Sequence, residues 1–241
     1  DNSRVVVMGL CPSAMTTADS HTTYSLPSRA GLTDVLVTPN GVTGSRKQPF
    51  GRALEFAHAA VRIVLKARRT DNTVGKLYVK NLKLTVPARL VCGGLKWDIG
   101  TKQYLAAPAA ADLVINHSGQ ILSTEDTQVA VFYLTPCSPA DLLTDLTGTG
   151  GTPGLTLTAD VAKDINFTTG ARNASFPILD GNLNFMDQFG SPATQLKGGE
   201  SYETTLKFDI DSFTLEGEEK EWEDGGKMTV PVVVPEPTPG P

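Results

Sequence analysis

The sequence predicts an all-β protein, and three observations support that fold class. Turn-forming residues are frequent along the 241-residue chain, which contains 23 Gly and 16 Pro. The segments between the turns are short and rich in Val, Leu, Ile, Thr and Phe, and several alternate apolar with polar residues. The 40% hydrophobic content is enough to bury a core, as one large domain or as two of ordinary size. Short alternating segments separated by turns are typical of a sandwich or a barrel.

The first half of the chain contains two clear strand patterns. Residues 5–8 are an apolar run that ends at Gly9, which is typical of a core strand. Residues 77–86 alternate, with a change of register near Asn81. Pro87 follows directly, and proline cannot donate a hydrogen bond to a central ladder. We therefore expect residues 77–86 to close a first domain, 1–86, and a second domain to occupy residues 87–227.

Residues 54–67 allow two interpretations. The segment is rich in Ala, and Leu54, His58, Val61 and Leu65 share one face of a helix. As a strand, the same segment places alternate apolar residues on one side with equal regularity. Periodicity alone leaves both interpretations open.

The second half contains the strongest strand pattern of the chain, residues 202–211. The segments 129–134 and 155–161 also predict strands, the first of them buried. In 202–211 the apolar residues fall on one face and charged residues on the other, so the strand has one buried and one solvated side. The alternation changes phase after Ser212, which indicates a bulge or a bend. The buried face consists of Tyr202, Leu206, Phe208 and Ile210.

The last part of the chain, residues 228–241, predicts a strand followed by a proline-rich tail. The acidic run 216–224 before it is expected to form a solvated turn. Val230, Val232 and Val234 fall on one face of the strand, whereas the prolines of the segment occupy odd positions up to 239. Alternate N–H groups of a strand point to opposite edges, so the N–H groups missing at the prolines all belong to one edge. The other edge can pair fully, as is typical of an edge strand or of a strand inserted into a neighbouring subunit. The alternative is a terminal strand with a disordered tail.

The composition argues against several classes of function. A net charge of −5 disfavours nucleic acid binding, and no run of about 18 apolar residues predicts a membrane span. No nucleophile elbow, zinc-protease motif or phosphate-binding glycine loop is present. We therefore predict no catalytic residue, no cofactor, no metal ligand and no enzymatic activity. His58 is expected to be structural, Trp97 and Trp222 to pack at the edge of a core, and Cys11, Cys92 and Cys137 to be buried or idle thiols.

Two segments together resemble the fimbrillins of Bacteroides-type bacteria. The first, Phe56-x-His58-Ala59-Ala60, is similar to the F-x-H-A strand of that family, and Asp34-Val35-Leu36 resembles the short motif that precedes it. The second, Leu196-x-Gly198-Gly199-x-x-Tyr202, followed by a strand and by Glu221-Trp222, is similar to the closing pattern of the family. The order and separation of the two segments also match, over roughly residues 30 to 225.

The resemblance implies a fold and a function. Fimbrillins have two β-sandwich domains of transthyretin-like topology, so the resemblance favours a strand for residues 54–67. It also implies that residues 1–86 are a truncated remainder of a longer first domain. Family members are exported as lipoproteins, are processed by a protease and polymerise into fimbriae. We therefore expect a structural subunit of an extracellular fimbria on the outer membrane, which assembles with other fimbrial subunits through strand exchange. The alternative is a surface-anchored module that binds a glycan or a host protein and does not polymerise.

Overall fold

The computed structural model confirms the all-β fold class. Antiparallel strands make up most of the described part of the chain, and its one helical element is a 3-10 turn, Pro139–Leu142. No helix in that part is long and apolar enough to cross a membrane. The described residues are 5–13, 15–18, 22–26, 28–39, 42–44, 54–69, 77–121, 123–143, 154–177, 193–208, 213–220 and 227–232.

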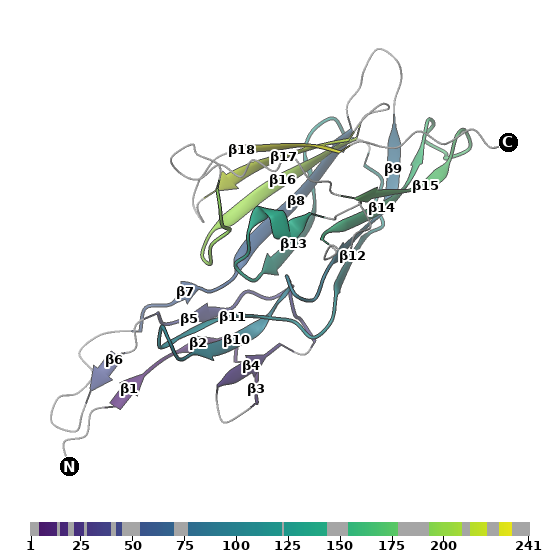
Figure 1. The fold of residues 1–241 in the computed structure, drawn as a ribbon. Coiled ribbons are helices and arrows are strands. Elements are labelled where there is room, and N and C mark those ends of the chain that lie inside the picture. Colours follow the sequence, from purple (N-terminus) through teal and green to yellow (C-terminus); the bar gives the residue numbers. More distant parts are fainter. Residues whose placement is uncertain are drawn as a thin grey trace, which may run out of the picture.

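Two sheets share the larger apolar core (Figure 1). All neighbours in them are antiparallel except β8 and β16, which run parallel. Both sheets contribute buried residues to one cluster, for example Leu84 and Phe132. The four-stranded sheet has the order β12 (Leu113–His117), β9 (Tyr78–Val86), β14 (Thr156–Ala162), β15 (Arg172–Pro177). The five-stranded sheet has the order β13 (Thr127–Leu134), β8 (Val61–Arg69), β16 (Ser201–Phe208), β17 (Phe213–Lys220), β18 (Lys227–Val232).

A second group of strands, mainly from the first part of the chain, lies beside these two sheets (Figure 1). It surrounds a smaller core. Its buried residues are Leu26, Val35, Val37, Ala60, Cys92 and Leu95. One sheet has the order β11 (Gln103–Pro108), β10 (Cys92–Asp98), β4 (Thr23–Ser25), β3 (Thr16–Ala18). A second sheet has the order β2 (Leu10–Cys11), β5 (Leu36–Val37), β7 (Ala57–His58), and β1 (Val5–Val7) pairs with β6 (Val42–Gly44).

Strand β9 contributes to the larger core, whereas we expected it to close the first domain. It pairs with β12 and β14, and its buried residues Leu82, Leu84 and Val86 belong to the larger cluster. The chain then returns to the smaller core through β10 and β11. Alternation specifies which face of a strand is buried but not which sheet covers that face. The division into domains 1–86 and 87–227 and a C-terminal segment 228–241 stays a prediction.

The register change near Asn81 is confirmed. The pairing of β9 with β14 shifts between Thr158 and Asp160, opposite this residue. Asn81 has a φ of 53°, and its amide nitrogen donates a hydrogen bond of 2.7 Å to Asp160. Asparagine tolerates the left-handed region better than most residues, so a bulge can form here at little cost.

Residues 54–67 are not helical, and the strand interpretation is confirmed for β7 and β8. The chain passes from the smaller sheet to the larger one at Ala59 and Ala60. The Ala59 N–H donates to the carbonyl of Val35, and the Ala60 carbonyl accepts a hydrogen bond from Gly199. Tertiary pairing therefore overrides the helical propensity of the Ala-rich segment.

The acidic run 216–224 was expected to be a solvated turn, and its described residues form a strand instead. Residues 216–220 lie in β17, which pairs with β16 on one side and β18 on the other. Phe208 is opposite Phe213 in an antiparallel ladder, so the phase change after Ser212 corresponds to a reversal of the chain. Residues 209–212 and 221–226 lie outside the described residues.

Gly94 is required where β4 meets β10. Its φ is +148°, and a Cβ atom there would lie 1.9 Å from the Tyr24 carbonyl oxygen. We expect Gly94→Ala to lower the free energy of unfolding by roughly 2–3 kcal/mol, because it adds backbone strain and a steric clash. Gly100→Ala is the control, since the nearest atom to its Cβ is 3.4 Å away. Urea denaturation checks both variants, and equal stability of the two would contradict this account.

Candidate functional site

The inner face of the four-stranded smaller sheet carries a row of apolar and aromatic side chains. Leu95 of β10 is opposite Tyr24 of β4, and Trp97 of β10 is opposite Tyr104 of β11. Residues two apart on a strand share a face, so Trp97 lies on the same side as the fully buried Leu95. The face that forms the smaller core therefore continues past that core to Trp97 and Tyr104.

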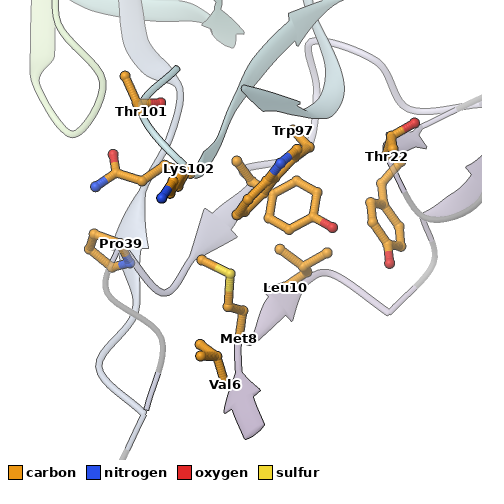
Figure 2. Close-up of a pocket in the computed structure, with 11 residues that line it drawn as sticks. Val6, Met8, Leu10, Thr22, Pro39, Trp97, Thr101 and Lys102 are labelled. Atoms are coloured by element: carbon orange, nitrogen blue, oxygen red, sulfur yellow. The ribbon is translucent and has the colours of Figure 1, made fainter. Parts of the chain in front are cut away.

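The opposing sheet is too short to cover this whole face. Strands β2, β5 and β7 have two residues each. They bury the Leu95 end and leave the Trp97 end as an open groove of about 870 Å³. Figure 2 shows Trp97 and Lys102 across this groove from Met8 and Leu10. The groove is lined by Val6, Met8, Leu10, Thr22, Tyr24, Pro39, Trp97, Thr101, Lys102, Gln103 and Tyr104.

Three aromatic rings form one wall of the groove. The Trp97 and Tyr104 rings meet edge to face with centroids 5.0 Å apart, and Tyr24 meets Tyr104 in the same way at 5.6 Å. Burial raises the pKa of the Tyr104 hydroxyl, with a further contribution from Tyr24. The Trp97 backbone N–H donates to the Thr22 carbonyl at 2.7 Å, which holds the strand in place. These contacts hold the three rings against one another on one strand face.

Open strand edges border the groove on both sides. In the described part of the chain, β11 is the last strand of its sheet and β2 is the last strand of the facing sheet. Val6, which precedes β2, is 60% exposed although it is apolar. An extended segment placed here could pair its backbone with an open edge and bury alternate side chains against Trp97 and Tyr104.

The residues that the sequence singled out for assembly lie elsewhere in the same chain. Val230 and Val232 are in β18, where they are opposite Leu215 and Phe213 of β17. β18 is the last strand of its sheet in the described part of the chain. Val234 and Trp222 lie outside the described residues. Val230, Val232 and Val234 as an assembly strand stay a prediction.

The groove itself was not predicted. Trp97 was expected to pack at a core edge, and it does pack against Tyr104, but it also lines the groove. One signal in the sequence could have indicated it. Leu95 and Trp97 are two residues apart, as are Tyr104 and Ala106, so in two strands each pair places its side chains on one face. The sequence gives no indication that the opposing sheet is short, because that depends on residues 10–58 pairing in three two-residue strands.

His58 has a structural hydrogen bond, as expected. Its Nδ1 lies 2.5 Å from Oδ2 of Asp34, and both side chains are partly buried. The bond joins β7 to the segment that leads into β5. Both strands belong to the sheet that lies opposite Trp97. In the described ranges, no three His, Cys, Asp or Glu side chains are grouped as metal ligands would be.

The three cysteines are free thiols and are expected to differ in reactivity. Burial raises the pKa of Cys92 to about 11 and that of Cys137 to about 12. Only the thiolate is nucleophilic, so both thiols should react slowly at pH 8. Cys11 is only partly buried. Titration with a thiol reagent at pH 8 should label one cysteine in the folded protein and three after unfolding. Fast labelling of all three without denaturant would contradict this expectation.

No family model and no curated protein matches the sequence. Among solved structures, the chain is similar to a candidate cell adhesion protein of Bacteroides uniformis, with 12% identity and a TM-score of 0.50, over 92% of this chain and 74% of that one. A candidate cell adhesion protein of Parabacteroides distasonis shares 9% identity with a TM-score of 0.53, over 99% and 78% of the two chains. The tip fimbrial protein of Porphyromonas gingivalis has a TM-score of 0.31 and 8% identity, over 78% and 58%. That last similarity is too weak to support an inference, and the first two show a common fold.

Proposed function

We propose that this protein is a structural subunit of a bacterial cell-surface fimbria that assembles by strand exchange and supports adhesion. The observation that carries the proposal is the open groove beside Trp97, which is bordered by β2 and β11, each the last strand of its sheet among the described residues. The fold shared with candidate cell adhesion proteins of two Bacteroidales species supports it. The resemblance of two sequence segments to fimbrillins points in the same direction.

In the proposed assembly, the groove of one subunit receives an extended segment of the next. Backbone hydrogen bonds to an open edge supply affinity, and alternate apolar side chains fill the space between Trp97 and Met8. The donor is the segment that carries Val230, Val232 and Val234. Within its own chain this segment pairs only with β17 among the described strands, so its release breaks one ladder and its insertion forms another.

The proposal includes the partners and the location of the protein. The partners are other fimbrial subunits, identical or different, and the protein lies outside the cell in a surface fimbria. A precursor with a lipid anchor in the outer membrane would deliver it there. The role requires no enzymatic chemistry and no cofactor.

Electron microscopy of producing cells tests this function. Cells that express the gene should carry filaments, and cells with the gene deleted should lack them. Complementation should restore filaments with the unchanged gene and with Ile99→Ser, which alters an exposed residue outside the groove lining. Complementation with Trp97→Ala should fail. Normal filaments on deleted cells would overturn the proposal.

The groove also supports a second candidate function, a surface module that binds a glycan or a host protein. Trp97 and Tyr104 lie beside the polar side chains of Thr22, Lys102 and Gln103, and aromatic and polar groups converge in this way in many ligand pockets. This function predicts that the isolated monomer binds an oligosaccharide or host protein with its groove and never polymerises.

A further inference from the structure

The turn that joins β10 to β11 holds a lysine in an unusual backbone conformation. Lys102 has a φ of 56°, which is in the left-handed region that favours glycine. Asp98 stabilises the turn, because its Oδ1 accepts the Thr101 N–H at 2.6 Å and the Thr101 hydroxyl at 2.7 Å. Non-glycine residues are uncommon in this region, and they cluster at functional sites where the surrounding structure holds them. The turn therefore fixes the backbone from which the Lys102 side chain extends.

Lys102 is the charged member of the groove lining. The other ten residues of the eleven that line the groove are apolar, aromatic or uncharged polar. Figure 2 places Lys102 on the same side of the groove as Trp97. Within the described part of the chain, no carboxylate forms an ion pair with it. An occupant that covers this end of the groove must bring a negative charge or leave the ammonium group without a counter-ion.

The proposed donor segment contains one matching charge. Glu236 is the single charged residue after Lys227, and it has the same parity as Val230, Val232 and Val234. In an extended segment, these four side chains fall on one face, whereas Pro231, Pro235, Pro237 and Pro239 have the opposite parity. A segment that directs its valines into the groove therefore directs Glu236 to the same side.

We propose that Lys102 fixes the register of the donor segment by pairing with Glu236 of a second copy of this chain. This inference rests on the proposed function. A slip of one residue would turn the valines away from the groove. A slip of two residues would place Val234 or Thr238 beside Lys102 and leave two charges unpaired. Such a pair selects one arrangement among several more than it increases affinity.

Charge reversal in the full-length chain tests the inference, with the mass of sedimentable filaments as the readout. Lys102→Glu and Glu236→Lys should each raise the protein concentration needed for assembly about tenfold, because like charges then meet. The double variant should restore assembly to within about twofold of the unchanged chain. Lys96→Glu is the matched control, since Lys96 is exposed on the same hairpin but does not line the groove. Thermal unfolding of each variant shows whether it is folded.

The outcomes separate this inference from the function on which it rests. Normal assembly of both single variants, or failure of the double variant to recover while it remains folded, would overturn the Lys102–Glu236 pair and leave the fimbrial function standing. Failure of the unchanged chain to assemble with itself would overturn the pair between two copies, whereas the filaments of producing cells test the fimbrial function separately. Loss of acidic oligosaccharide binding by Lys102→Glu, with assembly unaffected, would identify a glycan as the occupant and overturn the pair.

Discussion

Replacing Phe208 with alanine is expected to lower the free energy of unfolding by roughly 3–5 kcal/mol. Phe208 is 1% exposed and lies in the larger core with Tyr202 and Leu206 of the same strand. β16 is a central strand, paired with β8 on one side and β17 on the other, so the structure around the deleted ring has little freedom to collapse. A cavity therefore adds to the lost transfer free energy. Urea denaturation followed by circular dichroism measures the effect.

Lys207→Ala is the matched control for Phe208→Ala. Lys207 is the adjacent residue on the opposite face of β16 and is only partly buried. Its removal should change the free energy of unfolding by no more than about 0.5 kcal/mol. Similar losses in the two variants would show that the alternation of β16 does not separate a core face from a solvated one.

Deletion of residues 228–241 is expected to abolish polymerisation while the rest of the protein stays folded. The deletion removes almost all of β18, which is bonded to β17 on one side only among the described strands. Strands β8, β16 and β17 precede the deletion and keep their pairings with one another, so the rest of the sheet should remain intact. Sedimentation and electron microscopy measure assembly, and the cooperativity of thermal unfolding measures the fold.

Two other outcomes of deleting residues 228–241 are informative. Filaments that form normally from the truncated chain would refute the donor role of Val230, Val232 and Val234. A truncated chain that fails to fold would show that the segment is needed in its own sheet. A matched Val230→Thr, Val232→Thr variant keeps the strand length and should assemble poorly, because it removes apolar groups without shortening the ladder.

Local patterns in the sequence predicted single strands well. The buried face of β16 and the register change near Asn81 follow from alternation, and the strands on either side of Ala59 follow from family resemblance. Each depends on a few neighbouring residues. The acidic part of β17, residues 216–220, was predicted as a turn because of its charge, whereas its pairing with β16 and β18 makes it a strand.

Long-range arrangement could not be predicted from these patterns. Strand β9 was expected in the first domain, but its partners β12 and β14 follow it in the chain. The groove depends on the same kind of information, because Met8, Tyr24 and Trp97 are far apart in the sequence. The groove is open because the sheet of β2, β5 and β7, which faces Tyr24 and Trp97, is short. No local periodicity encodes either relation.

The central claim is that the groove beside Trp97 holds a segment of another copy of the chain. A photo-crosslinking amino acid at position 97, in filaments grown from a mixture of isotopically light and heavy protein, tests it most directly. The account predicts mixed light–heavy cross-links from position 97 to residues 228–241, and their loss in the unassembled monomer. Filaments whose cross-links from position 97 stay within one chain, or reach other segments, would contradict it.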